Sequence, residues 1–460
     1  MTRESEFSVR DKQVTVVGAA RSGVAAAHLL VSRKASVTLT DTRSEIAEAE
    51  ELRAAGVGLE LGEHRLETLL RSDLIVLSPG VPADQPAVAA ARAAGVHVMG
   101  ELELASRWLR GRIVAITGTK GKSTTTTLTG RMLEAGGHRV LVGGNIGHAL
   151  SAQVDASTED TIHVVEASSF QLETIETFRP WIAVLLNFSP DHLDRHATVE
   201  AYADAKSRIF VNQTATDWAV LNADDPAVAS MAAAALSRRL VFSMTDSLAS
   251  GVLVLGDEIV RRTAEGDQRL VPLSSIRLIG QHLIADVLAA SAVASLVGVD
   301  SESMTRAVEN FRGLEHALEP VAEISGVLFV NDSKATNVEA ARRAIESFNS
   351  IVVIMGGRFK GGDLRTLRQP LAERNATVIA IGESRDLIRD AVADVVAVYE
   401  AADMGKAVRT AFASAAPGTA VVLAPACASF DMFRDYAERG RVFKQEVARL
   451  QEEWNNVREQ

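Results

Sequence analysis

The segment GTKGKST, from Gly118 to Thr124, combines glycines, lysines and hydroxyl side chains at a spacing suited to phosphate binding. In such a loop the backbone N–H groups surround an anion at a helix N-terminus, where the helix dipole also favours negative charge. Lys122 would reach the outer phosphates, and Ser123 would place its hydroxyl on Mg²⁺. The usual G-x-x-x-x-G-K-[ST] pattern has a glycine where this chain has Ile116, so a glycine turn with a chance lysine is the alternative. The shorter loop consists of Gly118, Thr119, Lys120, Gly121, Lys122 and Ser123.

Three further apolar runs of this region end in polar residues suited to a metal or a phosphate. The runs are VLVGGNIG, IHVVEASSFQLE and WIAVLLNFSPDHLDRH, and the residues are Asn145, Glu166, Asp191 and His192. Because apolar strands that alternate with helices favour a parallel sheet, these residues are expected along one edge of it. Taken alone, Glu166 fits a turn carboxylate, but within this set we favour it as a Mg²⁺ ligand. His192 is a less usual ligand, because Mg²⁺ prefers oxygen.

The first hundred residues predict a Rossmann-like unit. The strand VTVVG precedes a small turn, an alanine-rich helix from about Ser22 to Val31 and a strand that ends at Asp41. Ala20 stands where the dinucleotide fingerprint requires its second glycine, so a pyrophosphate would be held less closely than in a nicotinamide enzyme. A ligand site is expected at the carboxyl ends of the strands, although the same residues also suit ordinary turns. They are Gly18, Asp41, Thr42, Arg43, Ser78 and Gly80.

The last part of the chain repeats the α/β pattern and carries a different set of polar residues. Strands in VLFVNDSKATN, IVVIMGGRFKGGD and TAVVLAPACASFD end in Lys334, Thr336, Lys360 and Ser429. Two lysines and two hydroxyls suit a small dianionic ligand, because charge-assisted hydrogen bonds can hold each carboxylate. Taken singly, a lysine of this kind is more often a solvated surface residue than a functional one. Lys206, in the alanine-rich segment YADAKSRIF, is by composition alone a solvated helix lysine.

Composition limits the class of protein. With 460 residues, 47% of them hydrophobic, the chain is long enough for about three domains. We expect a Rossmann-like domain over residues 1–100, a phosphate-loop domain with a parallel sheet over 101–313, and a Rossmann-like α/β domain over 314–460. A net charge of −11 without a basic block argues against nucleic acid as a partner.

The expected compartment follows from three features. The single Cys427 fits a reducing compartment, and the charged N-terminus is no secretory signal. The apolar run from Leu283 to Val299 is short and contains Asp286, so a buried helix is favoured over a membrane span. A cytoplasmic protein is expected, and we predict a monomer.

Eight motifs, in this order, resemble those of the Mur ligase family, and the resemblance covers nearly the whole chain. They are GTKGKST, GGNIG, VEASSFQLE, NFSPDHLDRH, the lysine of ADAKSRIF, VNDSKATN, GGRFKGGD and APACASFD. The resemblance implies an ATP- and Mg²⁺-dependent amide ligase of cytoplasmic peptidoglycan precursor synthesis. NDSKATN, the lysine after GGRF and the PACAS segment resemble the members that add D-glutamate to UDP-N-acetylmuramoyl-L-alanine.

The resemblance also implies a role for each matching residue. Asp41, Thr42, Arg43 and the turn from Ser78 to Gly80 would hold the uridine diphosphate part of the substrate. The residues of the phosphate loop from Gly118 to Thr124 would hold ATP, with Asp332 near it and Asn145 near the substrate. Ser123, Glu166, His192 and a carbamylated Lys206 would bind Mg²⁺. The D-glutamate ligands would be Lys334, Thr336, Lys360 and Ser429, while Lys122, Lys206, His192 and Asn145 would take part in catalysis.

Three positions depart from the family pattern. The family has asparagines near the adenine where this chain has Leu283 and Asp286, and an arginine after the histidine where it has Ala317. Two other classes of protein stay open, beside a Mur-type ligase for another amino acid. A weakly catalytic UDP-sugar-binding regulator would explain the three departures, and measurable ATP-dependent amide formation would exclude it. A nicotinamide oxidoreductase would use only the first domain and would leave the phosphate loop unexplained.

Overall fold

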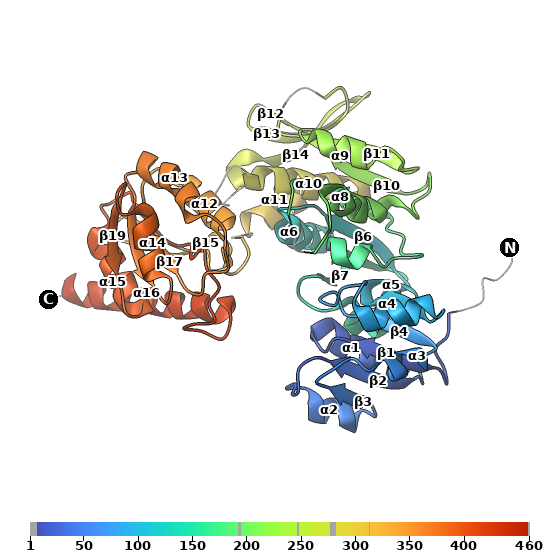
Figure 1. The fold of residues 1–460 in the computed structure, drawn as a ribbon. Coiled ribbons are helices and arrows are strands. Elements are labelled where there is room, and N and C mark those ends of the chain that lie inside the picture. Colours follow the sequence, from blue (N-terminus) through green and yellow to red (C-terminus); the bar gives the residue numbers. More distant parts are fainter. Residues whose placement is uncertain (1–6, 192–194, 246–247, 277–281, 312, 459–460) are drawn as a thin grey trace. The chain divides into compact units, whose positions relative to one another are not determined.

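The computed structural model describes residues 7–191, 195–245, 248–276, 282–311 and 313–458, and its strands form three sheets (Figure 1). The chain divides into two compact units, each described by itself. Residues 1–276 and 282–310 belong to the first unit, which contains two of the sheets, and residues 311–460 belong to the second. The protein is therefore an α/β protein with three sheet-containing domains.

The N-terminal sheet has five strands in the order β3-β2-β1-β4-β5, all parallel. The strands are β1 (Gln13–Val17), β2 (Ser36–Asp41), β3 (Gly58–Leu61), β4 (Leu74–Leu77) and β5 (His97–Gly100). The helices are α1 (Arg21–Ser32), α2 (Ala49–Ala54), α3 (Leu66–Leu70), α4 (Pro86–Ala93) and α5 (Glu101–Ser106). In this sheet β1 lies between β2 and β4, so the direction of strand order reverses at β1. The carboxyl ends of β1 and β4 therefore flank a topological switch point, where ligands bind. The expected Rossmann-like βαβ unit is present.

The central sheet has nine strands in the order β14-β13-β12-β11-β10-β9-β6-β8-β7, with an antiparallel edge formed by β12, β13 and β14. The strands are β6 (Arg112–Thr117), β7 (Arg139–Gly144), β8 (Thr161–Glu166), β9 (Ile182–Leu185), β10 (Trp218–Asn222), β11 (Arg238–Ser243), β12 (Gly251–Leu255), β13 (Glu258–Thr263) and β14 (Gly266–Pro272). Every residue of β8 and β9 is buried, as in a parallel sheet covered on both faces. The phosphate loop follows β6, which lies between these two strands.

The helices of the central domain are α6 (Lys122–Ala135), α7 (Ser169–Leu172), α8 (Val199–Ser207), α9 (Pro226–Met231), α10 (His282–Val297) and α11 (Ser301–Glu309). The apolar run beginning at Leu283 lies in α10, which packs against α6. No described helix combines the length and apolarity that a membrane crossing requires. The short helix α9 lies within residues 217–278, whose sequence reads as strands and turns. It begins there because the Asp225 side chain caps it and Pro226 suits its first turn.

The third sheet has six strands in the order β15-β16-β20-β17-β18-β19, of which only β15 is antiparallel to its neighbour. The strands are β15 (Glu319–Ile324), β16 (Val327–Asn331), β17 (Ile351–Gly356), β18 (Thr377–Ile381), β19 (Ala397–Glu400) and β20 (Ala420–Leu423). The helices are α12 (Val338–Glu346), α13 (Arg368–Glu373), α14 (Arg385–Val392), α15 (Met404–Ser414) and α16 (Tyr436–Arg458).

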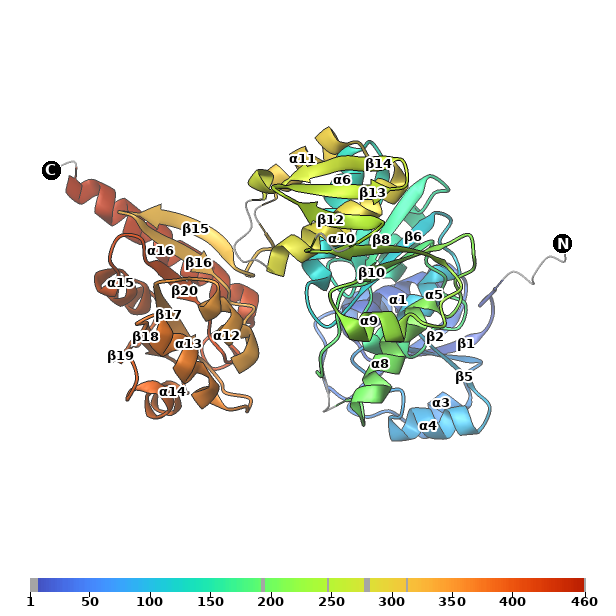
Figure 2. The same ribbon diagram turned by 90° about the horizontal axis from the view of Figure 1, so that it is seen from above.

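Alternation along the strands gives this sheet two covered faces. Val353 and Met355 pack with α12, α13 and α14, whereas Val352 and Ile354 pack with α15 and α16 (Figure 2). The polar turns at the carboxyl ends of its strands are therefore carried by a sheet that is buried on both sides.

Candidate active site

The phosphate loop joins the end of β6 to the start of α6. Gly118 and Gly121 have φ angles of +155° and +79°, which a residue with a Cβ adopts only with strain. Asn187 follows the apolar run of β9, and its side-chain amide forms hydrogen bonds with the backbone of the loop. Its Oδ1 accepts hydrogen bonds from Thr119 N (3.1 Å) and Lys120 N (2.9 Å), and its Nδ2 donates to Lys120 O (3.1 Å). Asn187 was not singled out from the sequence, although it begins the NFSPDHLDRH motif.

Two lysines meet at one carbonyl oxygen of this loop. Lys122 Nζ donates to Gly118 O and to Thr119 O, at 2.9 Å each, and Lys206 Nζ donates to Gly118 O at 2.8 Å. Lys206 lies on α8 and is only 1% exposed, so the interpretation of a solvated helix lysine is wrong. Burial, followed by the nearby charge of Lys122, lowers the pKa of Lys206 to about 7. Near neutral pH a large fraction of Lys206 is therefore the uncharged amine.

Glu166 and Asn145 lie at the ends of the neighbouring strands β8 and β7. Asn145 Nδ2 donates to Glu166 Oε1 at 2.7 Å, and Asn145 N donates to Glu166 O at 2.9 Å. Glu166 is 2% exposed, and its second carboxylate oxygen, Oε2, is buried without a hydrogen-bond partner. Such an oxygen fits a cation, since buried polar atoms are normally paired.

Two further candidate metal ligands are Ser123 and His192. Ser123 is half-buried in the first turn of α6, and His192 lies outside the described residues. In the described ranges, no three His, Cys, Asp or Glu side chains gather into a metal-binding group. Mg²⁺ is commonly held by one or two protein oxygens together with water and phosphate, and Ser123 and Glu166 can supply such oxygens.

Asp286, one of the departures from the family pattern, lies against the phosphate loop. It is 4% exposed, and a Cβ at Gly121 would lie 2.1 Å from its Oδ1. Burial raises the pKa of Asp286 to about 8. The protonated carboxyl is thus favoured at neutral pH, so that this position is uncharged, as an asparagine would be. Leu283, in the first turn of the same helix, is half-buried.

The candidate uridine diphosphate residues gather at the switch point of the N-terminal sheet. Asp41 Oδ2 accepts from Ala19 N at 2.6 Å, and Asp41 Oδ1 accepts from Arg43 Nε at 2.9 Å. The Arg43 side chain holds the pKa of Asp41 far below its usual value. Gly18 is close to the Ser78 turn, because a Cβ there would lie 3.0 Å from Ser78 Cβ. Thr42 and Gly80 are exposed at the ends of the two turns.

A narrow pocket between the first and central domains adds residues that the sequence did not reveal. It is lined by Ser78, Glu101, Phe170, Gln171 and Arg195, among others. Ser78 Oγ, Glu101 Oε2 and Gln171 Nε2 are all buried without a hydrogen-bond partner. Three such atoms around one pocket suit a polar ligand. Gln171 belongs to the motif VEASSFQLE, but nothing in its spacing indicates that its side chain faces Ser78.

The second unit brings the remaining candidate residues together at the carboxyl ends of β16, β20 and β17. Backbone hydrogen bonds join the turns: Ala426 N donates to Ala335 O at 3.0 Å, and Arg358 and Ala428 exchange two bonds of 2.9 Å. These turns carry the exposed Lys334 and Lys360, the half-buried Thr336 and Ser429, which is 2% exposed.

Asp332 follows β16 in the same unit. It accepts from Leu318 N at 3.2 Å, and burial raises the pKa of its carboxyl to about 7. Ala317, the third departure, is half-buried in the neighbouring segment that precedes β15.

A phosphate loop beside a buried lysine and a buried carboxylate, between two further α/β domains, defines a nucleotide-dependent enzyme of three domains. The chain belongs to the Mur ligase family. It matches the MurD-like N-terminal domain of Mur ligases over residues 12–100, the Mur ligase middle domain over 116–294 and the Mur ligase glutamate ligase domain over 318–427.

The relatives cover almost the whole chain. A protein of Acidobacterium capsulatum named UDP-N-acetylmuramoylalanine–D-glutamate ligase is 48% identical over 444 residues, which are 95% of this chain and 96% of the relative. A protein of the same name from Koribacter versatilis is 44% identical over 97% of this chain and 99% of its own length. Among solved structures, the UDP-N-acetylmuramate-alanine ligase of Thermotoga maritima is similar with a TM-score of 0.59 at 18% identity, covering 95% of this chain and 99% of that one. At this identity the likeness shows the fold alone.

Proposed function

We propose that this chain joins D-glutamate to UDP-N-acetylmuramoyl-L-alanine in an ATP-dependent reaction of cytoplasmic peptidoglycan precursor synthesis. The observation that carries the proposal is the convergence of Lys122 and Lys206 on the phosphate loop, in a chain whose relatives of that name align over nearly its full length. The two lysines mark a site for phosphoryl transfer, and the names of the relatives supply the substrates.

The chemistry follows from the low reactivity of a carboxylate. Its oxygen attacks the γ-phosphorus of ATP, the bond from that phosphorus to ADP breaks, and an acyl phosphate forms. The amine nitrogen of D-glutamate then attacks the acyl carbon, phosphate leaves and the nitrogen releases a proton. Phosphoryl transfer requires mainly positioning and charge neutralisation, so Lys122 has to exchange its loop carbonyls for the phosphates of ATP.

Magnesium fits the unpartnered Glu166 Oε2, and Glu166, Ser123 and His192 are the residues that would hold it. When bound, Mg²⁺ neutralises charge on the phosphates. We propose that Lys206 completes the site as a carbamate. Its neutral amine attacks CO₂, a nitrogen–carbon bond forms and a proton is released, which converts a cation beside the loop into an anion. The lowered pKa of Lys206 supports this, because only the neutral amine reacts.

The other substrates are assigned by domain. Asp41, Thr42, Arg43, Ser78 and Gly80 would bind the uridine diphosphate part, with Asn145 near the muramoyl end. Lys334, Thr336, Lys360 and Ser429 would bind D-glutamate, and Asp332 would lie near ATP. We propose domain boundaries at residues 100 and 313, and the monomeric state stays a prediction.

Phosphate release from ATP tests the proposal. It is measured with UDP-N-acetylmuramoyl-L-alanine present and with D-glutamate, L-lysine, L-alanine or meso-diaminopimelate added in turn. D-glutamate alone should give stoichiometric phosphate and an amide product. Release with another amino acid would change the substrate, and binding of the UDP substrate without any release would favour a weakly catalytic regulator.

A further inference from the structure

Arg439 lies near the start of α16 and is only 1% exposed, so its charged group is in the interior of the second unit. Its Nε donates to Ser333 Oγ at 3.0 Å, its Nη2 to Ser333 O at 2.9 Å and its Nη1 to Cys427 O at 3.0 Å. All three acceptors are uncharged. Burial lowers the pKa of the guanidinium to about 10, so Arg439 is still a cation at neutral pH. Desolvating a charge in this way is costly, and an apolar side chain of similar volume would often fill such a space with less cost.

The two residues that Arg439 holds are the neighbours of the candidate D-glutamate ligands. Ser333 precedes Lys334 in the turn after β16, and Cys427 lies two residues before Ser429 in the turn after β20. A guanidinium is a rigid planar fork, so its three bonds fix the distance between these turns more closely than a flexible side chain would. Two backbone bonds also join this region, from Ala426 N to Ala335 O and from Asp332 N to Leu423 O, and Arg439 adds a side-chain bridge between the two turns.

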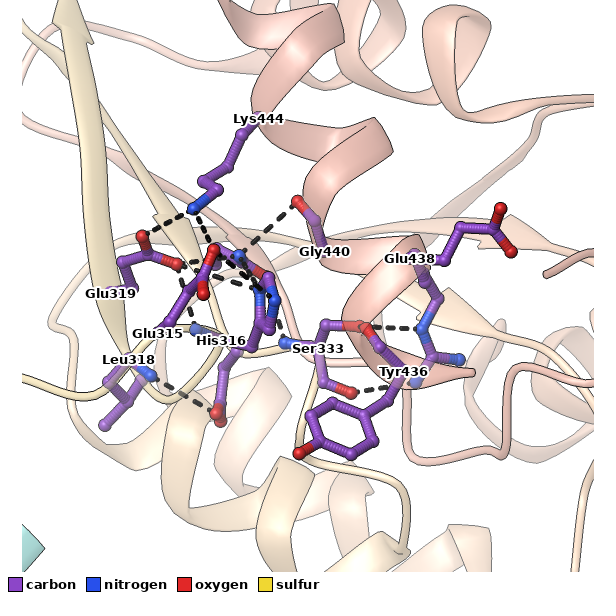
Figure 3. A network of polar contacts seen from close by, with 12 residues as sticks. Glu315, His316, Leu318, Glu319, Ser333, Tyr436, Glu438, Gly440 and Lys444 are labelled. Atoms are coloured by element: carbon purple, nitrogen blue, oxygen red, sulfur yellow. Dashed lines mark hydrogen bonds and ion pairs between the residues drawn. The ribbon is translucent and has the colours of Figure 1, made fainter. Parts of the chain in front are cut away.

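A second set of contacts joins α16 to the turn after β16, which contains Ser333. Ser333 Oγ donates to Tyr436 O at 2.7 Å (Figure 3). Ser333 N donates to Asn331 Oδ1 at 3.1 Å. His316, in the left-handed region at φ +66°, packs so closely that a Cβ at Gly440 would lie 2.2 Å from its Nδ1. Figure 3 also shows Lys444 reaching Glu315 and Glu319, at 2.7 and 2.9 Å. The helix that carries Arg439 is thus fixed relative to the turn that Arg439 holds.

We propose that Arg439 is a positioning residue for the amino-acid substrate. It sets the separation of the turns that carry Lys334 and Ser429, and thereby the affinity for a small dicarboxylic amino acid. The inference rests on the proposed function, because that function assigns the amino acid to these turns. Arg439 acts through Ser333 and Cys427 and need not touch the substrate.

Steady-state kinetics of the whole chain test this, with each substrate varied at saturating levels of the others. Arg439→Lys keeps the positive charge but removes the planar guanidinium group. We expect the KM for D-glutamate to rise about tenfold, which corresponds to the loss of one to two hydrogen bonds to a charged group. The KM values for ATP and the UDP substrate and the kcat should change less than about twofold. Arg449→Lys is the matched control, since Arg449 lies on the same helix in an exposed ion pair with Glu446, and its kinetics should equal those of the unchanged chain.

Ser333→Ala provides a milder variant if Arg439→Lys folds poorly. It removes one acceptor of Arg439 and should raise the KM for D-glutamate about threefold with the same selectivity. When Ser333→Ala is combined with Arg439→Lys, it should raise the KM for D-glutamate by a smaller factor than Ser333→Ala does alone, because both changes break the same connection. Equal increases in the KM of all three substrates, or a lower melting temperature with unchanged KM values, would overturn the proposal. If the unchanged chain released no phosphate with D-glutamate, the proposed function itself would have failed, and the same variants would be measured with whichever amino acid is accepted.

Discussion

Among the individual residues of the candidate site, Gly118 stands out because its carbonyl oxygen accepts hydrogen bonds from both Lys122 Nζ and Lys206 Nζ. Burial, and after it the like charge of Lys122, lowers the pKa of Lys206. The sequence predicted the phosphate-loop role of Lys122 from spacing alone. For Lys206, composition predicted a solvated lysine, which is wrong because whether a helix lysine faces solvent depends on tertiary packing rather than on its neighbours in the chain. The resemblance to the Mur ligases implied a carbamylated metal ligand, which stays a prediction.

Replacing Lys206 tests whether an oxygen anion is needed at its position. Lys206→Ala should lose most of the ligase activity, and short carboxylic acids such as formate or acetate should restore part of it. They place a carboxylate where the carbamate would be. The measurement is amide formation against the concentration of added acid, with Lys122→Ala as a control that no acid restores. Full activity of Lys206→Ala in the absence of acid would exclude the carbamate.

Lys122→Ala should nearly abolish ligation and leave binding of the UDP substrate unchanged. The reason is that Lys122 lies at the loop after β6, whereas the candidate uridine diphosphate residues follow β1, β2 and β4. Product formation and calorimetric titration with the UDP substrate measure the two effects separately. A parallel loss of both would mean that the nucleotide sites are wrongly assigned to their domains.

Lys360→Ala should raise the KM for D-glutamate far more than the KM for ATP. Lys360 is exposed near the turns that carry Lys334 and Ser429, where it would pair with a substrate carboxylate, and its ammonium also lies 5.3 Å from the Phe430 ring centroid. Exposed Lys406, on α15, supplies the control substitution, and Lys406→Ala should leave both constants unchanged. If the KM for ATP rises more, Lys360 belongs to the nucleotide site instead.

At the scale of elements, hydrophobic runs predicted most of the strands and helices that position the site. The strands β1, β2, β8 and β17 and the helices α1 and α10 lie close to their expected ranges, because each coincides with an apolar run of the sequence. Short elements specified by a cap, such as α9, were missed. The contacts between elements were also missed: Asn187 on the loop, Gln171 beside Ser78 and Asp286 against Gly121 each join segments that are distant in the sequence.

The packing of α10 on α6 leads to a pH-dependent prediction. The pKa of Asp286 rises from 3.8 to about 8 in the folded chain, so folding takes up a proton between these values and stability falls as pH rises through that window. Asp286→Asn removes this dependence. Its melting temperature should exceed that of the unchanged chain by more at pH 8 than at pH 5, as measured by circular dichroism.

Asp257→Asn is the control for Asp286→Asn, because Asp257 is exposed at the turn between β12 and β13 and should show no such difference. An equal shift of the melting temperature at both pH values for Asp286→Asn would mean that Asp286 is already ionised in the folded chain.

At the scale of the whole molecule, each compact unit has its own buried sheet and core. Leu128, Ile116 and Phe242 lie in the first unit, and Val353, Phe329 and Phe443 in the second. Three α/β domains were predictable from the alternation of strands and helices. That the first two domains form one compact unit could not be predicted, because it depends on contacts between them, such as the bonds from Arg21 to Gly147 O and from Arg33 to Asp155.

Two units with separate cores should unfold in two calorimetric transitions, and matched core substitutions should assign them. Phe443→Ala should lower only the transition of the second unit and Phe242→Ala only that of the first, because each deletion of a buried ring costs about 3–5 kcal/mol within its own core. The UDP substrate at about a hundred times its Kd should then stabilise only the transition that Phe242→Ala lowers, by about 2.7 kcal/mol. A single transition, or a UDP substrate that raises both transitions equally, would show that the two units unfold as one.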